Sequence, residues 1–97
     1  MKALNGVRVL DLTTLLPGPL ATLILAEAGA DVVKIEAPAG EDMRRFPPMR
    51  GDRSALFSML NRGKRSIALD LKSEHGHASL DALVRAADVL VEQFRPG

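Results

Sequence analysis

The chain of 97 residues is long enough for one small domain, and its 46% hydrophobic and 26% charged residues are typical of a globular protein. The formal net charge of +1 and the aromatic content of 3% argue against binding to nucleic acid or to an anionic membrane, and no apolar run approaches the roughly 20 residues that span a bilayer. Because the chain has no cysteine and no signal-peptide pattern, we expect a cytoplasmic protein without disulfides or thiolate metal sites.

Strand and helix patterns alternate from the start of the chain. Residues 7–12 form a short run rich in β-branched residues, which predicts a strand. Pro17 suits the first turn of a helix, and the apolar segment 20–28 predicts a buried helix that ends at Gly29. Residues 31–36 again have the composition of a strand.

The middle of the chain interrupts this alternation. Residues 37–53 contain three prolines, two glycines and four arginines, which predicts a long loop. A loop of this length inside a compact domain is usually functional or disordered. Ser54 then predicts the N-cap of a short helix that extends to Asn61.

The last third of the chain adds a strand, a helix and another strand. Residues 66–71 and 89–92 have strand patterns, and between them Ser73 predicts the N-cap of an amphipathic helix that reaches Ala87. The order β-α-β-loop-α-β-α-β predicts an α/β fold, a parallel sheet with helices on both faces. The last predicted strand lies at the end of the sequence, and no further helix follows to cover it. We therefore expect a fragment of a larger protein.

Candidate ligand-binding groups lie where the predicted strands end, because open parallel sheets bind ligands beyond their carboxyl ends. The first such segment, residues 13–19, lacks both the glycine pattern of a dinucleotide-binding fold and a P-loop. It is either a generic anion site at a helix N-terminus or simply a tight turn. Glu36 could bind a ribose hydroxyl, but without the glycine pattern we favour an exposed carboxylate paired with a nearby Lys or Arg.

Basic residues are concentrated between positions 44 and 65. Arginine binds phosphate oxygens through two parallel hydrogen bonds, so a phosphorylated ligand is the functional interpretation, and a solvated basic loop is the alternative. His75 and His77 point to different faces of a predicted helix and do not predict a metal site. No local spacing indicates a nucleophilic catalytic arrangement. The candidate phosphate contacts are Arg44, Arg45, Arg62, Lys64 and Arg65.

Five stretches, taken in order, resemble the start of the class III CoA-transferases (the CaiB/BaiF family), which include formyl-CoA transferase, carnitine CoA-transferase and α-methylacyl-CoA racemase relatives. Each stretch alone is only moderately specific, but together they cover nearly the whole chain in the right order. They are LNGVRVLDL with PGP at 4–12 and 17–19, LAEAGADVVKIEAP at 25–38, GEDMR at 40–44, NRGKRSIALDLK at 61–72 and ADVLVEQFRPG at 87–97.

The resemblance implies a Rossmann-like N-terminal part, residues 1–97, of a larger enzyme that forms an interlocked homodimer and uses CoA rather than NAD or a metal. Some relatives have Gln in place of Leu16 and many have Asn in place of Gln93, so this sequence departs from the family pattern at both positions. The positions that match CoA-contacting residues of the family are Leu16, Pro17, Ala37, Leu69, Lys72, Gln93, Phe94 and Arg95.

Three functions follow from the resemblance. The first is a transferase that moves CoA from an acyl-CoA to a carboxylic acid through an aspartyl-CoA intermediate, with its catalytic aspartate beyond Gly97. The second is an α-methylacyl-CoA racemase, which uses a His/Asp pair that would also lie beyond Gly97. The third is a nucleotide-binding module that acts alone. No residue of this chain matches a catalytic position of either enzyme.

Overall fold

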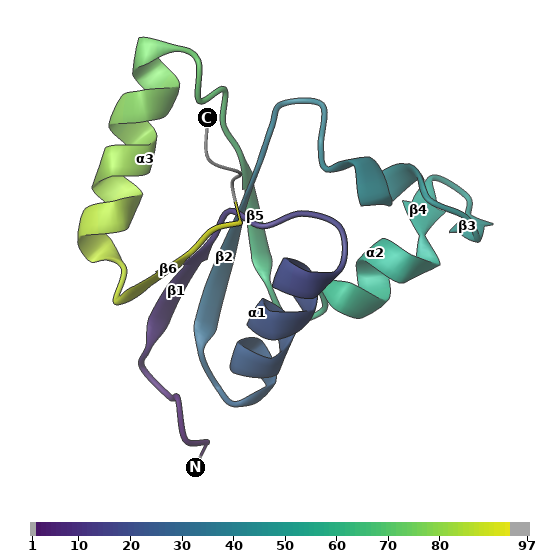
Figure 1. The fold of residues 1–97 in the computed structure, drawn as a ribbon, viewed down its shortest axis with the longest axis horizontal. Coiled ribbons are helices and arrows are strands. Elements are labelled where there is room, and N and C mark those ends of the chain that lie inside the picture. The colour runs from purple at the N-terminus through teal and green to yellow at the C-terminus, as the bar shows by residue number, and fades with distance from the viewer. Residues whose placement is uncertain (1, 94–97) are drawn as a thin grey trace.

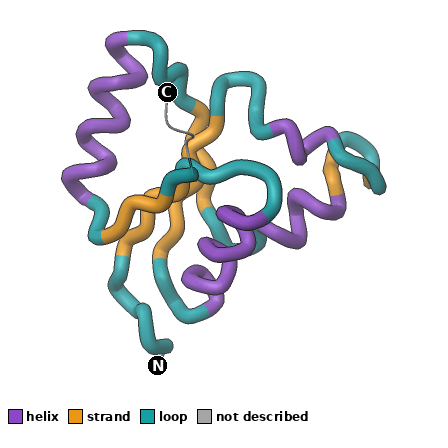
Figure 2. Tube along the Cα trace, in the orientation of Figure 1, coloured by secondary structure: helices purple, strands orange, loops and turns teal. Residues whose placement is uncertain are grey.

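The computed structural model describes residues 2–93, which form an open sheet with helices on its two faces (Figures 1 and 2). The elements, in chain order, are β1 (Arg8–Asp11), α1 (Pro17–Glu27), β2 (Asp31–Glu36), the 3-10 helix η1 (Asp42–Arg45), β3 (Met49–Arg50), β4 (Arg53–Ser54), α2 (Ala55–Leu60), β5 (Arg65–Ala68), α3 (Glu74–Ala86) and β6 (Val89–Val91).

The main sheet has the strand order β5-β2-β1-β6, and every pair in it is parallel. Val9 of β1 is in register with Val32 of β2 on one side and with Val89 of β6 on the other. The carboxyl ends of all four strands therefore meet along one edge. The order reverses at β1, and such a switch point is where open α/β sheets bind ligands. The predicted parallel α/β fold is confirmed.

Alternate residues of the central strands serve two separate cores. Val9 packs with Val32 on the face covered by α1, and Leu10 packs with Ile35 on the face covered by α3. Figure 1 shows α3 on one side of the sheet and α1 with α2 on the other. The amphipathic stripe predicted for this helix contributes Leu80 and Leu83 of α3, and Ala87 at its C-cap, to the second core.

Two element boundaries differ from the sequence-based prediction by three residues, and the others by at most one. The first helix begins at Pro17, three residues earlier than predicted, because a proline fits the first helical position, where no N–H is needed. Strand β5 ends at Ala68 instead of residue 71, because Asp70 starts a turn. Its side chain accepts a hydrogen bond from Lys72 N at 3.0 Å and its backbone oxygen accepts one from Ser73 N at 3.1 Å.

Residues 37–53 contain more regular structure than the predicted loop. They hold η1 and all but the last residue of the two-stranded β3–β4 hairpin, whose turn places Gly51 at φ 63°. The pair Gly51-Asp52 is a recognised hairpin signal in a sequence, so this turn could have been predicted. Within residues 2–93, none of the helices has the length and apolar character needed to cross a membrane.

Candidate functional site

The turn between β1 and α1 lies at the carboxyl edge of the sheet, next to the switch point. Leu15 in this turn has a positive φ of 66°, and Leu16 occupies the N-cap of α1 without capping through its side chain. The side chain of Gln93, just after β6, donates to Thr14 O at 3.0 Å and so connects β6 to the turn.

Gly18 allows this turn to close tightly. A Cβ at this position would lie 2.2 Å from both Thr13 Cβ and Gln93 Oε1, far inside van der Waals contact. Only glycine therefore lets α1 start so close to the end of β1. Because prolines have no N–H, the first turn of α1 has few backbone donors for an anion, and it is a weaker anion site than a glycine-rich loop.

Beneath the turn, Asp11 is the centre of a buried polar cluster. Its carboxylate is fully buried and accepts hydrogen bonds from Thr13 N at 2.8 Å and from Thr22 Oγ1 at 2.6 Å. Lys64 Nζ lies 3.2 Å from Asp11 Oδ2, and its side chain is only 1% exposed. Burial alone would raise the pKa of Asp11, but the hydrogen bonds from Thr13 and Thr22 outweigh burial and lower that pKa. Burial lowers the pKa of Lys64, and Asp11 offsets only part of this effect.

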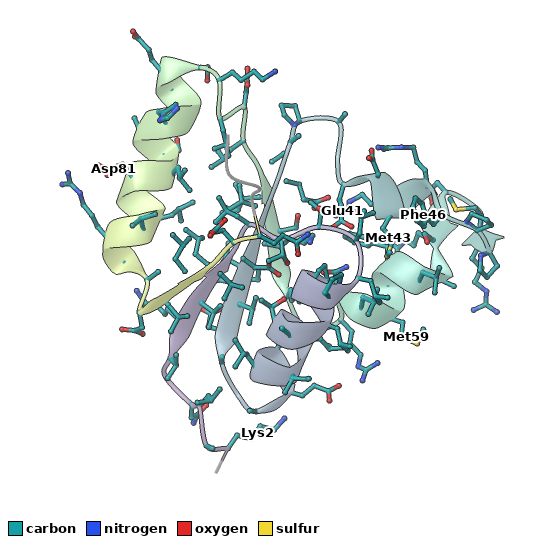
Figure 3. The ribbon with its side chains drawn as sticks, in the orientation of Figure 1. Lys2, Glu41, Met43, Phe46, Met59 and Asp81 are labelled. Atoms are coloured by element: carbon teal, nitrogen blue, oxygen red, sulfur yellow. The ribbon has the colours of Figure 1, made fainter. Side chains whose placement is uncertain are left out.

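A second buried ion pair, between Lys34 and Glu41, contacts the turn directly. Lys34 Nζ lies 2.6 Å from Glu41 Oε1, and both side chains are 1% exposed. Lys34 Nζ also donates to Thr13 O at 3.0 Å, while Glu41 Oε2 accepts from Leu15 N at 2.9 Å. Glu41 therefore lies on the inner side of η1, toward the sheet (Figure 3). Neither residue was singled out from the sequence.

Glu36 connects the end of β2 to η1. Its carboxylate accepts two hydrogen bonds from Arg44, at 2.7 and 2.6 Å, one from Glu41 N at 2.8 Å and a short one from Ser66 Oγ. Burial would raise the pKa of Glu36, but the hydrogen bonds of Arg44 and Ser66 outweigh it and lower that pKa to about 2. The hydrogen bonds to Glu36 raise the pKa of Arg44, whose guanidinium also lies 4.0 Å from the ring centre of Phe57.

The prediction for Glu36 was therefore correct about its partner and wrong about its exposure. The carboxylate is paired with a basic residue, as expected, but Glu36 is only 6% exposed. It is buried because η1 and Ser66 of β5 close over the end of β2, and a distant contact of this kind leaves no local pattern in the sequence.

A largely apolar hollow of about 260 Å³ opens beyond the carboxyl ends of β1, β2 and β5. Three of the predicted CoA contacts, Ala37, Leu69 and Lys72, line it. Leu16 and Pro17 belong to the adjoining turn, and Gln93, just after β6, donates to the backbone of Thr14, which also lines the hollow. Phe94 and Arg95 lie outside the described residues. Contact between these residues and CoA stays a prediction. The remaining lining residues are Leu12, Ile35, Glu36, Pro38, Asp70 and Leu71.

The five candidate phosphate contacts are not brought together in space. Lys64 is buried and paired with Asp11, and Arg44, whose side chain is 42% exposed, is paired with the buried carboxylate of Glu36. The other three form exposed ion pairs, and each has a different carboxylate partner. These pairs are Arg45 with Asp42, Arg62 with Glu27 and Arg65 with Asp31. Phosphate binding by any of the five stays a prediction.

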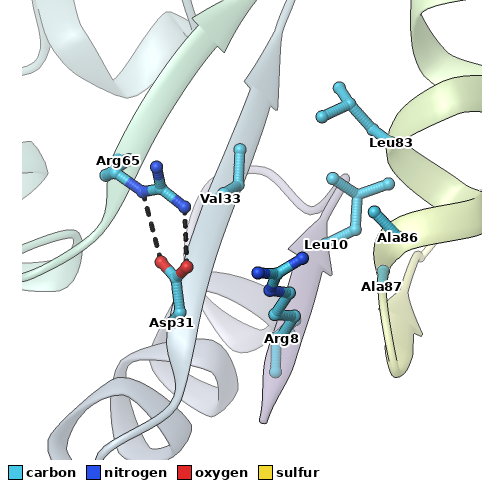
Figure 4. Close-up of a pocket in the computed structure, with 9 residues that line it drawn as sticks. Arg8, Leu10, Asp31, Val33, Arg65, Leu83, Ala86 and Ala87 are labelled. Atoms are coloured by element: carbon cyan, nitrogen blue, oxygen red, sulfur yellow. Dashed lines mark hydrogen bonds and ion pairs between the residues drawn. The ribbon is translucent and has the colours of Figure 1, made fainter. Parts of the chain in front are cut away.

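Arg65 lies at the opposite, amino edge of the sheet. It lines a hollow of about 300 Å³ together with Arg8 and residues of α3, and its guanidinium forms two hydrogen bonds to Asp31, at 3.2 and 2.6 Å (Figure 4). Because β5 runs parallel to β2 and starts with Arg65, this side chain cannot reach the carboxyl edge, where the predicted CoA contacts lie.

Comparison with known proteins places the chain in one family. Residues 4–97 match the profile of CoA-transferase family III. The chain is 51% identical to the acetyl-CoA:oxalate CoA-transferase of Acetobacter aceti over 96% of its length, and 48% identical to the succinyl-CoA:mesaconate CoA-transferase of Haloarcula hispanica over 100% of its length.

The fold agrees with the same family, because the crystal structure of a CAIB/BAIF family protein from Brucella suis superimposes with a TM-score of 0.87 at 41% sequence identity, covering 96% of this chain and 26% of that one. The crystal structure of the hypothetical protein Rv3272 from Mycobacterium tuberculosis superimposes with a TM-score of 0.92 at 43% sequence identity, covering 100% of this chain and 27% of that one. The chain covers 24% of the Acetobacter enzyme and 26% of the Haloarcula enzyme, so it spans about a quarter of the length of the curated relatives it matches.

Proposed function

The chain belongs to CoA-transferase family III, and from this premise we propose that it forms the N-terminal, CoA-binding part of an enzyme that transfers CoA from an acyl-CoA to a carboxylic acid. The observation that carries this proposal is the apolar hollow at the carboxyl edge of the sheet, lined by Ala37, Leu69 and Lys72. It lies beside the turn at the switch point, where a sheet of this order binds nucleotides.

The hollow has the chemistry that the nucleotide end of CoA requires. Apolar side chains such as Leu12, Leu69 and Leu71 can cover the face of a flat base, and Lys72 at the rim can neutralise a phosphate. Among residues 2–93, Lys72 forms no ion pair with a carboxylate, whereas each of the five candidate phosphate contacts named from the sequence does. Lys72 is therefore the cation best placed to meet a phosphate here.

In this proposal, a catalytic aspartate outside these 97 residues carries out the reaction at the acyl group. That carboxylate attacks the thioester carbonyl, which forms an anhydride and releases the CoA thiolate; the thiolate then attacks the aspartyl carbonyl and expels the donor acid. The carboxylate of the acceptor acid then attacks the aspartyl thioester, which forms a second anhydride and releases the CoA thiolate. The thiolate attacks the acyl carbonyl of this anhydride, which gives the new acyl-CoA and frees the aspartate. The chain's own residues hold CoA during the exchange. We further propose an interlocked homodimer in the cytoplasm.

Isothermal titration calorimetry of the full-length enzyme with CoA and with dephospho-CoA tests the binding site. We expect Lys72→Ala to weaken CoA binding by about tenfold, the effect of losing one charge-assisted hydrogen bond. Lys2→Ala removes the same charge at the far end of the molecule and should leave binding unchanged (Figure 3). If wild type and Lys72→Ala bind CoA equally, the placement of the nucleotide is wrong.

The reaction itself is tested by incubating the full-length enzyme with an acyl-CoA and a second carboxylic acid. Formation of the second acid's CoA ester supports transfer. Exchange of the α-proton with solvent deuterium, without formation of a new CoA ester, would instead indicate the racemase alternative.

A further inference from the structure

Leu15 adopts a left-handed backbone conformation that a leucine rarely adopts. Among residues 2–93 it is the single non-glycine residue with a positive φ, 66°. In this region Cβ crowds the backbone, so the conformation persists only where the surrounding structure holds it. The position matters because Leu15 is followed directly by Leu16 and Pro17, two of the residues expected to contact CoA.

The side chain of Glu41 holds this conformation. Glu41 Oε2 accepts a hydrogen bond from Leu15 N at 2.9 Å, and its other oxygen, Oε1, lies 2.6 Å from Lys34 Nζ. Lys34 in turn donates to Thr13 O at 3.0 Å. One buried ion pair therefore contacts the turn on both sides of Thr14.

Glu41 is itself fixed to the sheet. Its backbone N donates to Glu36 Oε1 at 2.8 Å, and Glu36 is the last residue of β2. Leu15 and Glu41 also form part of the wall of another hollow, of about 220 Å³, which shares Thr14, Ile35, Glu36 and Ala37 with the proposed CoA site. Through Glu41, the turn and the loop after β2 form one continuous wall.

We propose that Glu41 is a positioning residue for CoA, with Lys34 as its buried counter-charge. It does not contact the ligand; it holds Leu15 at positive φ and so fixes the turn against which CoA binds. The inference rests on the proposed function, because it assumes that CoA occupies the hollow beside this turn.

Two double variants of the full-length enzyme isolate the contact to Leu15 N. Removing Glu41 alone would leave Lys34 as an uncompensated buried charge, so both variants carry Lys34→Met. Lys34→Met/Glu41→Gln keeps a carbonyl oxygen that can accept from Leu15 N. Lys34→Met/Glu41→Leu does not. The two proteins are otherwise matched in charge and similar in side-chain size.

We expect the Gln variant to bind CoA nearly as wild type does, and the Leu variant to bind it roughly tenfold more weakly, with a similarly raised KM for acyl-CoA and kcat within about twofold of wild type. Thermal unfolding of both variants reports whether they are folded. Equal CoA affinity in two folded variants overturns the inference but leaves the proposed function intact. A wild-type enzyme that does not bind CoA overturns the proposed function, and the inference with it.

Hydrogen exchange provides a second test that does not depend on the variants folding. The amide of Leu15 in wild-type enzyme without CoA should exchange at least about tenfold more slowly than an open turn amide, because Glu41 already holds it. Exchange at the rate of an unprotected amide would overturn the inference.

Discussion

Replacing Glu36 with Gln should remove a pH-dependent contribution to stability that can be calculated from the structure. The pKa of Glu36 is about 2 in the folded chain, against an ordinary value of 4.5. This difference corresponds to about 3 kcal/mol of folding free energy at neutral pH. Because the folded pKa is the lower one, the stabilisation is present above about pH 4.5 and is lost as the pH falls toward 2.

The measurement is urea unfolding of the wild-type chain and of Glu36→Gln at several pH values between 7 and 2. The signal should be far-UV circular dichroism, because the chain has no Trp or Tyr for fluorescence. We expect the difference in unfolding free energy to be about 3 kcal/mol at pH 7 and to approach zero near pH 2, where the wild-type carboxyl also becomes protonated.

Glu27→Gln is the matched control. Glu27 also pairs with an arginine, Arg62, but its side chain is 54% exposed, so the pair should contribute less than about 1 kcal/mol at any pH. A Glu36→Gln difference that stays constant from pH 7 to pH 2 would refute the reasoning. The loss would then come from hydrogen-bond geometry or packing and not from the charge of Glu36.

Three further substitutions test other parts of the fold by the same unfolding assay. Gly18→Ala should destabilise the chain by about 1–3 kcal/mol, since its Cβ would overlap Thr13 and Gln93; unchanged stability would contradict the tight turn. Ser73→Ala should cost about 1 kcal/mol, because the hydroxyl caps α3 by accepting from Gly76 N, and a loss below about 0.3 kcal/mol would count against the cap. Arg85→Ala should change stability by no more than about 0.5 kcal/mol, since its ion pair within α3 is exposed, and a larger loss would indicate a contact not seen here.

The sheet could be predicted because its signals are local. Residues 31–36 form β2 with the predicted bounds, and Ser54 and Ser73 are the N-caps predicted for α2 and α3. Each of these predictions depends on a handful of neighbouring residues whose pattern matches the period of a strand or the chemistry of a helix start. The CoA-transferase family was recognised from longer motifs, and the profile match confirms it.

The buried ionic cluster could not be predicted because its contacts join distant parts of the chain. Asp11 and Lys64 are 53 residues apart, and Lys34 lies in a strand that otherwise has an ordinary apolar pattern. A charged residue in the middle of a central parallel strand is the one available signal, since both faces of such a strand are covered. The basic segment 44–65 gave a wrong impression of proximity, because Arg44 pairs with Glu36 at the end of β2 and Arg65 pairs with Asp31 at its start.

The face of the sheet that α1 covers changes from apolar to ionic along the direction of the strands. The ionic part lies beneath the turn beside which we propose that CoA binds. Near the amino edge, Val9 and Val32 pack as an ordinary core. Near the carboxyl edge, Asp11, Lys34 and Glu36 take the corresponding inward positions and are all buried.

Apolar side chains can fill the space under a turn, but they cannot satisfy its backbone N–H and C=O groups or hold a residue at positive φ. The buried charges do both, at Thr13 and Leu15. Removing such charges one at a time is strongly destabilising, whereas replacing a pair together is often tolerated. The Lys34–Glu41 pair is therefore better explained by the conformation it gives to the turn than by the stability it adds, and the two Lys34/Glu41 double variants separate these two roles.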